Sequence, residues 1–407
     1  MTATHHCKAK DFVVIEMADL TGEHISGVAS DVLNLVRAYS SRVSLIGSCR
    51  DGPHGEWAEA VISGHRVPFF SVGCLGVPKK GQLLPRAVWV AARLWRYKRQ
   101  ILKQAPEAMF TCAADALIAT NDWGWAQTCF RFPGIENGAD KSRFLLGRRL
   151  AGRYDRQRMR ALQNVNVILA AADEDAIMRL VVRSNGALSR ERIIGFPTSV
   201  DTEVFFPTPK DVARRSLGLN QEDVILASIG RLSKVKGWRL LLEAFSRWCN
   251  GGSHGQLLFV GDGEDRHLVL GRARELGIAS QVRITGIKGA TEVSQYLNAA
   301  DLIVVGSDSE GWSLSMLEAL ACGRPIVSTP VSGARAMVRN GENGYVIDHW
   351  NADEFSLAIT RALKLHDATR VAREIAESYS TRHLASRLES VWPYLAAKTA
   401  MLGVSSV

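Results

Sequence analysis

Two carboxylates stand close together in a stretch of the sequence that is otherwise small or apolar. In "SDSEGWSLSMLEALACGRP", residues 307–325, Glu310 and Glu318 are separated by seven residues. The run from Ser315 to Glu318 fits a capping box, in which the glutamate bonds back to the first turn of a helix. Glu310 precedes that helix beside Gly311, and helical side chains tilt toward the N-terminus, so both carboxylates can face one cleft at the carboxyl end of a strand. The spacing alone favours the helix start, and a ligand site stays open as the alternative.

Two cations follow the first strand of the second half of the chain. In "ASIGRLSKVKGWRLLLEAF" a strand ends at Gly230, Arg231 follows it, and Lys236 and Gly237 stand just before a strongly patterned helix. Backbone N–H groups and the helix dipole would add to these charges, so the segment suits a diphosphate. The alternative is a pair of solvated loop residues, which this segment taken by itself favours.

A glycine-rich turn follows the next strand. In "FVGDGEDRHL" the turn is formed by Gly261, Asp262 and Gly263. It has neither the G-x-G-x-x-G dinucleotide fingerprint nor the P-loop pattern. A ligand loop and a tight turn in which Asp262 bonds its own backbone are both open.

A D-x-D pattern, Asp173 to Asp175 in "ILAAADEDAIMRL", is the type that some glycosyltransferases use to hold a divalent metal. It stands where a helix begins, and acidic residues in a first helical turn are favoured by the helix dipole. We therefore favour helix capping over metal binding. The seven cysteines form no C-x-x-C pair, so no metal cluster is expected from them either.

The elements that must position these residues alternate between short apolar strands and helical patterns. Such alternation predicts α/β domains with mostly parallel sheets covered on both faces, which bind ligands at the carboxyl ends of their strands. The pattern restarts after the proline-containing stretch "FPTSVDTEVFFPTPK", and 407 residues exceed what one hydrophobic core usually supports. We predict a first domain at 1–195, a linker at 196–210, a second domain at 211–384, and a closing amphipathic helix at about 385–407 that completes the first domain.

The net charge of +9 is concentrated in the first half of the chain. Residues 1–200 hold 27 Lys and Arg against 18 Asp and Glu, whereas residues 201–407 hold 23 of each kind. A basic helix is predicted at about 86–103, with Trp89 among its cations and four of them taken as membrane-facing: Arg93, Arg96, Arg99 and Lys103. Basic residues interleaved with tryptophan suit an anionic membrane surface. A solvated basic face is the alternative, and nucleic acid is disfavoured because no known binding module is recognisable.

No apolar run approaches the ~18 residues of a membrane span, and the first residues show no leader-like apolar core. We therefore expect a cytoplasmic protein, peripheral on the inner face of the membrane.

Taken in order, the motifs of residues 228–348 resemble the C-terminal domain of family 4 glycosyltransferases, a retaining group with the two-domain GT-B fold. The resemblance is carried by "GRLSKVKG", "FVGDGED", "ITG", "AADLIVVGSDSEGWSLSMLEALACGRPIVST" and "SGARAMVRNGENGYVID". Fainter similarity extends from "SGVASDVLNLVRAY" to the linker, so most of the chain is covered. The fold that the resemblance implies is α/β, with two Rossmann-like domains.

The resemblance also implies roles for individual residues. Arg231 and Lys236 match the family's phosphate-binding pair, which stabilises the departing diphosphate without a metal. Glu318 matches the carboxylate that binds the ribose hydroxyls, and Glu310 matches the one that faces the donor sugar near its reacting end. Further donor contacts fall on Gly261, Asp262, Gly263 and on the backbone amides of Gly311, Trp312, Ser313 and Leu314.

The N-terminal domain of the family contributes a glycine-rich loop near the phosphates and the acceptor. Here that loop is "DLTGEHISG", with Gly22 and Gly27 as the candidates and Ser26 in place of the first of the usual paired glycines. Many relatives have a histidine after a middle strand of this domain, but the matching stretch "TNDWGWAQTCFRFPGIENG" has none. His24 is the candidate to replace it. The linker also departs from the usual Pro-Asn-Gly-Val-Asp, with Thr198 and Ser199 at its centre.

The sequence therefore predicts a metal-independent retaining glycosyltransferase of the hexosyltransferase type, with no cofactor and a nucleotide diphosphate-sugar as donor substrate. The expected acceptor is a glycan or lipid-linked molecule at the cytoplasmic membrane face, as in cell-surface polysaccharide, lipopolysaccharide or glycolipid biosynthesis. A catalytically silent sugar-nucleotide-binding or partner protein of the same fold is the alternative. A nicotinamide oxidoreductase is a further rival, against which the missing G-x-G-x-x-G counts.

Overall fold

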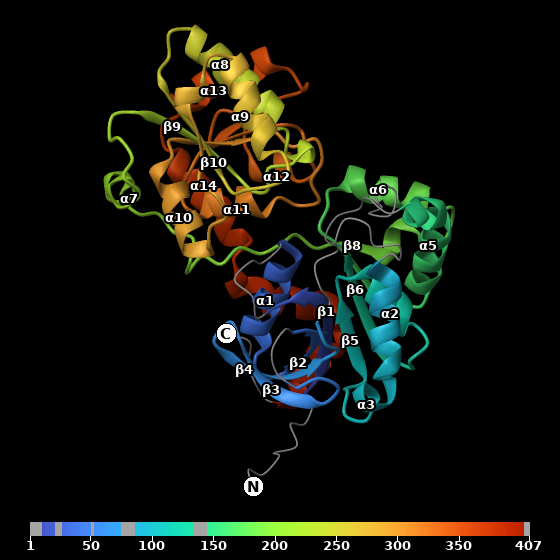
Figure 1. The fold of residues 1–407 in the computed structure, drawn as a ribbon. Helices are drawn as coiled ribbons and strands as arrows, with labels where there is room; N and C mark the ends of the chain where they lie inside the picture. The colour runs from blue at the N-terminus through green and yellow to red at the C-terminus, as the bar shows by residue number, and fades with distance from the viewer. Residues whose placement is uncertain (1–9, 21–26, 50–52, 75–85, 133–144, 403–407) are drawn as a thin grey trace. The chain divides into compact units, whose positions relative to one another are not determined.

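The structure is a computed structural model that describes residues 10–20, 27–49, 53–74, 86–132 and 145–402. It divides into two compact units (Figure 1). Unit 1 comprises Met1–Pro197 and Arg382–Val407, and unit 2 comprises Thr198–Thr381. The C-terminal helices, red in Figure 1, therefore belong with the N-terminal half of the chain.

Unit 1 contains a sheet of eight strands in the order β3-β4-β2-β1-β5-β6-β7-β8. All neighbours pair in parallel except β3 and β4, which form an antiparallel hairpin at one edge. The strands are β1 (Phe12–Asp19), β2 (Val43–Ser48), β3 (Trp57–Ile62), β4 (His65–Ser71), β5 (Ala108–Thr111), β6 (Gln127–Phe132), β7 (Val167–Ala170) and β8 (Ile193–Gly195).

The helices of unit 1 cover the two faces of this sheet separately. One core cluster gathers residues of α2, α3, α4, α5 and α6 on one face, and a second gathers those of α1, α15 and α16 on the other. The helices are α1 (Gly27–Tyr39), α2 (Arg86–Arg96), α3 (Lys98–Leu102), α4 (Ala114–Thr120), α5 (Leu145–Gln163), α6 (Glu174–Arg183), α15 (Leu384–Val391) and α16 (Pro393–Leu402), with short 3-10 turns η1 (Arg190–Arg192) and η4 (Thr381–His383).

Two helices predicted as continuous are each broken in the structure. The basic helix predicted at 86–103 is interrupted at Tyr97, which lies between α2 and α3. The ring of Tyr97 packs edge-on against that of Phe70, with the ring centroids 5.8 Å apart. The closing helix is interrupted at Trp392, because Pro393 has no N–H to continue the helical ladder. Trp392 is fully buried there and packs against Phe12 of β1.

Unit 2 contains a sheet of six strands, all paired in parallel, in the order β11-β10-β9-β12-β13-β14. Each strand is a short apolar run because both faces of a parallel sheet are covered by helices. The strands are β9 (Val224–Ile229), β10 (Gly255–Val260), β11 (Val282–Ile284), β12 (Leu302–Val305), β13 (Ile326–Ser328) and β14 (Gly344–Val346).

Helices α8, α9 and α13 pack on one face of this sheet, and α10 and α11 contact strands of the same sheet from the other helical layer. The helices are α7 (Lys210–Leu217), α8 (Trp238–Asn250), α9 (Arg266–Glu275), α10 (Ala290–Ala299), α11 (Leu314–Ala321), α12 (Ala334–Met337), α13 (Ala352–Ala362) and α14 (Ala368–Ser378), with 3-10 turns η2 (Lys234–Lys236) and η3 (Ala279–Gln281).

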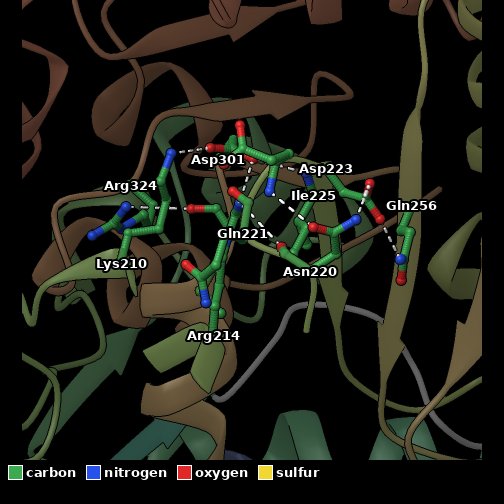
Figure 2. Close-up of polar contacts among 12 residues, drawn as sticks. Lys210, Arg214, Asn220, Gln221, Asp223, Ile225, Gln256, Asp301 and Arg324 are labelled. Atoms are coloured by element: carbon green, nitrogen blue, oxygen red, sulfur yellow. Dashed lines mark hydrogen bonds and ion pairs between the residues drawn. The ribbon is translucent and has the colours of Figure 1, made fainter. Parts of the chain in front are cut away.

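A polar network lies at the amino-terminal ends of the strands of this sheet, here called its amino edge (Figure 2). Arg214 of α7 is 1% exposed and donates to Asp301, to the carbonyl of Ala299 and to that of Gln221. The same Asp301 carboxylate accepts the amide of Ile225, at the start of β9. These bonds hold α7, α10 and the starts of two central strands, β9 and β12, in fixed positions relative to one another.

Candidate functional site

The site residues predicted in unit 2 lie at the carboxyl ends of the strands of its sheet, here called its carboxyl edge. Strands β9 and β10 run in register from Val224 and Gly255 to Ile229 and Val260. The loops that follow them therefore start side by side. The loop after β12 begins at the same edge, because β12 is parallel to β9 and adjacent to it.

The first two loops pack back to back through glycine. A Cβ on Gly261 would lie 2.0 Å from the carbonyl oxygen of Gly230, and a Cβ on Gly263 would lie 2.2 Å from that of Leu232. Leu232 also donates its amide to the carbonyl of Asp262 at 3.0 Å. Only glycine permits this close approach of two backbones.

The Asp262 side chain acts within its own turn in this structure. It accepts the amide of Gly263 at 2.8 Å and pairs with Arg266 at 2.9 Å. This is the tight-turn geometry that the sequence left open. A donor-binding role for Asp262 stays a prediction.

Lys236 is brought to the loop after β12, here named the donor loop (residues 306–313). Its Nζ lies 2.6 Å from Oε1 of Glu310. Two backbone contacts hold the same loops together: Asp308 donates its amide to the carbonyl of Val235 at 2.8 Å, and a Cβ on Gly237 would lie 1.6 Å from the carbonyl oxygen of Gly306. Lys236 is therefore placed by its turn as well as by its ion pair.

The carboxylate of Glu310 uses only one of its two oxygens for hydrogen bonds within the described part of the chain. Its side chain is 13% exposed, and it accepts bonds from Lys236 and from the Ser307 hydroxyl at 2.7 Å, both on Oε1. Within the described part of the chain no partner is found on Oε2. One carboxylate oxygen is thus available to a hydroxyl group of a ligand.

Glu318 lies in the second turn of α11 rather than at its start. The helix begins at Leu314 with Ser313 as its N-cap residue, which makes no side-chain capping bond. The capping box predicted for Ser315 and Glu318 is therefore wrong, because the helix starts earlier than the serine. Glu318 is free of that task and is held among the buried residues of α11.

The environment of Glu318 favours its neutral form. Burial raises the pKa of this carboxyl to about 8, and the charge of Lys236 opposes the shift only in part. Lys236 thus interacts with two acidic side chains at this edge of the sheet: the ion-paired carboxylate of Glu310 and the carboxyl of Glu318. Arg231 supplies a second cation on an exposed side chain after β9.

The donor loop is supported by residues whose role the sequence did not reveal. Ser307, buried at 1% exposure, bonds Glu310 through its hydroxyl, and its carbonyl accepts the hydroxyl of Thr329 at 2.7 Å. Ser307 stood inside the quoted motif, but nothing in its spacing distinguished it from the other small residues. Ser313 bonds Ser315 at 3.1 Å, and Trp312 is turned inward at 9% exposure.

The predicted residues of unit 1 are only partly described. Gly22 and His24 lie outside the described residues, and Gly27 is the first residue of α1. The D-x-D stretch is a helix start, as predicted: the Asp173 side chain accepts the amide of Ala176 at 2.9 Å, and Glu174 pairs with Arg190 at 2.6 Å. In the described ranges no cluster of three or more His, Cys, Asp or Glu side chains could hold a metal ion.

The four cations predicted to face a membrane are not equivalent. Arg96, Arg99 and Lys103 are exposed. Arg93 is half-buried and donates to the carbonyl of Val72, just after β4, at 3.3 Å. Arg93 is therefore withdrawn from that surface, because its guanidinium holds the end of a strand.

The part of the chain that carries this site also matches a known protein family. Residues 209–379 match the family described as glycosyl transferases group 1. The matched residues all lie within unit 2. The match spans all six strands of its sheet and every site residue discussed in unit 2.

Curated relatives match over a similar part of the chain. A D-inositol 3-phosphate glycosyltransferase of Geodermatophilus obscurus is 31% identical over 226 residues, which are 53% of this chain and 48% of that protein. One of Mycobacterium marinum is 32% identical over 193 residues, 44% of this chain and 40% of that protein. The chain thus spans less than half the length of these relatives.

Solved structures match over nearly the whole chain at low identity. A sucrose-phosphate synthase from Thermosynechococcus elongatus has a TM-score of 0.77 at 18% identity and covers 96% of this chain and 100% of that one. Anabaena HepE in complex with UDP-glucose has a TM-score of 0.69 at 17% identity, with 96% and 100% covered. The fold is therefore α/β of the GT-B type, as the resemblance implied.

None of the helices in the described ranges combines the length and the apolar composition that crossing a bilayer requires.

Proposed function

We propose that the protein is a retaining, metal-independent glycosyltransferase that transfers a sugar from a nucleotide diphosphate-sugar to a glycan or lipid-linked acceptor. The observation that carries the proposal is the group formed by Lys236, its carboxylate partner Glu310 and the carboxyl of Glu318, at the carboxyl ends of the strands of unit 2. Such a group offers a cation to phosphate and acceptor oxygens to sugar and ribose hydroxyls. One similar structure, Anabaena HepE, was solved both with UDP and with UDP-glucose, which supports the donor class.

The chemistry asks the site to stabilise a leaving diphosphate. When the bond between the sugar carbon and the β-phosphate oxygen breaks, negative charge develops on that phosphate. Preorganised cations at that position lower the barrier without needing a metal. In this proposal Lys236 leaves Glu310 for the phosphate, and Glu310 is then free to bind the sugar through both carboxylate oxygens. Glu318 accepts the ribose hydroxyls.

We place the reaction at the cytoplasmic face of a membrane because of the surface of unit 1. Exposed tryptophans stand among the exposed cations of α2 and α3: Trp89 is 47% exposed and Trp95 57%. Helix α5 packs into the same core cluster and adds Arg153, Arg156 and Arg160, all exposed. Cations with interfacial tryptophan suit an anionic lipid surface, at about 1 kcal/mol for each Lys or Arg near it.

A panel of UDP-, GDP- and ADP-sugars, each with and without a lipid acceptor fraction, tests the function. We expect nucleotide release with at least one donor, increased by the acceptor and retained in EDTA. Binding of a nucleotide-sugar without any release would instead favour the silent sugar-nucleotide-binding protein. Release that stops in EDTA and returns with a divalent metal would contradict the metal-independent mechanism.

Vesicle sedimentation tests the membrane face. The triple variant Arg96→Glu, Arg99→Glu, Lys103→Glu should bind anionic vesicles on the order of 100-fold more weakly than the wild type. The control carries the same charge change on exposed residues of unit 2: Arg274→Glu, Arg283→Glu and Arg361→Glu. Equal binding by the two triple variants would contradict the membrane proposal.

A further inference from the structure

Trp312 is the aromatic residue of the donor loop, and its side chain turns into unit 2. Its ring is 9% exposed, and its centroid lies 5.7 Å from that of Tyr379. On another side it meets Gly333, where an added Cβ would lie 2.7 Å from the indole ring. Gly333 has a φ of +79° at the start of α12, so this contact is made by bare backbone. The ring is thus wedged between two segments far away in the sequence.

Tyr379 belongs to the place where the chain leaves unit 2. Its carbonyl accepts the amide of Val200 at 2.9 Å, and the carbonyl of Val200 accepts the amide of Thr381 at 2.9 Å. The hydroxyls of Thr202 and Ser380 are 2.9 Å apart. Because the chain enters unit 2 at Thr198 and leaves it after Thr381, the two connecting segments are bonded to each other beside Trp312.

The donor loop is therefore held from two directions. At its beginning it is tied to the Lys236 turn through Asp308 and Gly306. At its end Trp312 anchors it to Tyr379 and Gly333. Glu310 and Gly311 lie between these two anchors, at the place assigned above to the sugar.

We propose that Trp312 is a positioning residue, whose wedged ring sets the backbone amides from Gly311 to Leu314 for the sugar end of the donor. This inference rests on the proposed function. Arg231 and Glu318 lie outside the loop, so binding of the nucleoside diphosphate does not depend on the wedge. The indole nitrogen has no hydrogen-bond partner in the described part of the chain. Shape therefore matters, and phenylalanine should replace tryptophan.

The test compares Trp312→Leu with Trp312→Phe and with a matched control, Trp248→Leu. Trp248 is 5% exposed and stacks on Phe245 at 5.8 Å, and its ring lies near Gly255 at the other edge of the sheet. We expect kcat to fall about 10- to 100-fold in Trp312→Leu, while the Kd for nucleoside diphosphate changes by no more than about threefold. Trp312→Phe should keep most of the turnover. Trp248→Leu should lose stability but not turnover per folded molecule.

Equal kcat values for Trp312→Leu and Trp248→Leu, or equal losses of kcat and of nucleoside diphosphate binding in Trp312→Leu, would overturn the proposal. Hydrogen–deuterium exchange of residues 306–313 without donor gives a readout that does not depend on activity. Faster exchange is expected in Trp312→Leu and not in Trp248→Leu. If the wild type turns over no donor while this exchange pattern holds, the proposed function fails and the wedge stands. If the wild type is active and neither exchange nor kcat responds, the wedge alone fails.

Discussion

The sheet of unit 2 has a lysine–carboxylate pair at each of its two edges, and the pairs differ in what surrounds them. At the carboxyl edge Lys236 bonds Glu310 at 2.6 Å, and at the amino edge Lys210 bonds Asp301 at 2.6 Å. Asp301 also accepts Arg214 and the amide of Ile225, so both of its oxygens are used. Glu310 takes both of its bonds on one oxygen.

This difference separates a structural network from a site prepared for a ligand. At the amino edge the buried guanidinium of Arg214 gives its remaining N–H groups to backbone carbonyls, which satisfies a charge that would otherwise be costly to bury. The carboxyl edge instead has groups that can bind a ligand: one carboxylate oxygen of Glu310, the exposed Arg231 and the carboxyl of Glu318, whose pKa is raised. Removing a charge should therefore cost stability at the first edge and function at the second.

The largest effect is expected at Arg214. Arg214→Met keeps the apolar stem but leaves Asp301 and several carbonyls without their buried partner. The free energy of unfolding should fall by about 3–5 kcal/mol. Urea unfolding measures it, with turnover per folded molecule unchanged. A loss below about 1 kcal/mol would mean that the amino edge is not a structural network.

Lys236→Ala should show the reverse pattern. Nucleotide release should slow about 100- to 1,000-fold, because a preorganised charge at the departing phosphate is lost. The melting temperature should change by no more than about 2 °C, since Lys236 is 35% exposed and its turn is also held through backbone. A large loss of stability with normal turnover would reverse the roles given to the two edges.

Glu318→Gln should change how stability depends on pH. Burial is the main cause of the raised pKa of Glu318, about 8, and the unfolded carboxyl titrates near 4.5. Between these values the folded state holds the proton that the unfolded state has released, so wild-type stability falls as pH rises from about 5 to 8. The variant should gain up to a few kcal/mol on the wild type over that range. Exposed Glu342→Gln is the control, and parallel pH curves for wild type and Glu318→Gln would contradict the burial account.

The smallest effect is expected at Lys210. Its side chain is 46% exposed, so Lys210→Ala should cost no more than about 1 kcal/mol of unfolding free energy. Turnover should equal that of the wild type. Its ion pair has the same length as that of Lys236. A fall in turnover would therefore contradict the view that the surroundings of each pair decide whether it serves structure or function.

The strands of unit 2 could be predicted because parallel strands are short continuous apolar runs. The apolar runs "VILASIG", "QLLFVGDG", "VRITG", "DLIVVGS", "RPIVSTP" and "GYVID" predict six strands, and they are β9 to β14. In unit 1 the runs "DFVVIEMADL", "RVSLIGS", "AMFTCAA", "NVNVILAAA" and "RIIGFP" predict β1, β2, β5, β7 and β8, but β3, β4 and β6 were missed. Strands β3 and β4 form a hairpin whose outer strand is only partly buried, with a turn at Ser63 and Gly64. Strand β6 contains Arg131, whose burial depends on its ion pair with Asp31 of α1.

The candidate site could be predicted as a set of residues but not as an arrangement. The order of the motifs in the sequence predicted one site that contains Arg231, Lys236, Glu310 and Glu318. The bond between Lys236 and Glu310 joins residues 74 positions apart and depends on the close approach of two glycines, which spacing does not reveal. The start of α11 was misplaced because Ser313 and Ser315 are both of a residue type that can cap a helix, and the helix begins directly after Ser313.

The most direct test of the account is the binding of UDP, GDP and ADP to the full chain, measured by calorimetry for wild type, Lys236→Ala and Lys210→Ala. The wild type should bind at least one of the three. Lys236→Ala should weaken this binding by about tenfold or more, whereas Lys210→Ala should change it by less than about twofold. Binding that is lost equally in both variants, or absent from the wild type, would contradict the claim that the carboxyl edge of unit 2 is the nucleotide-sugar site.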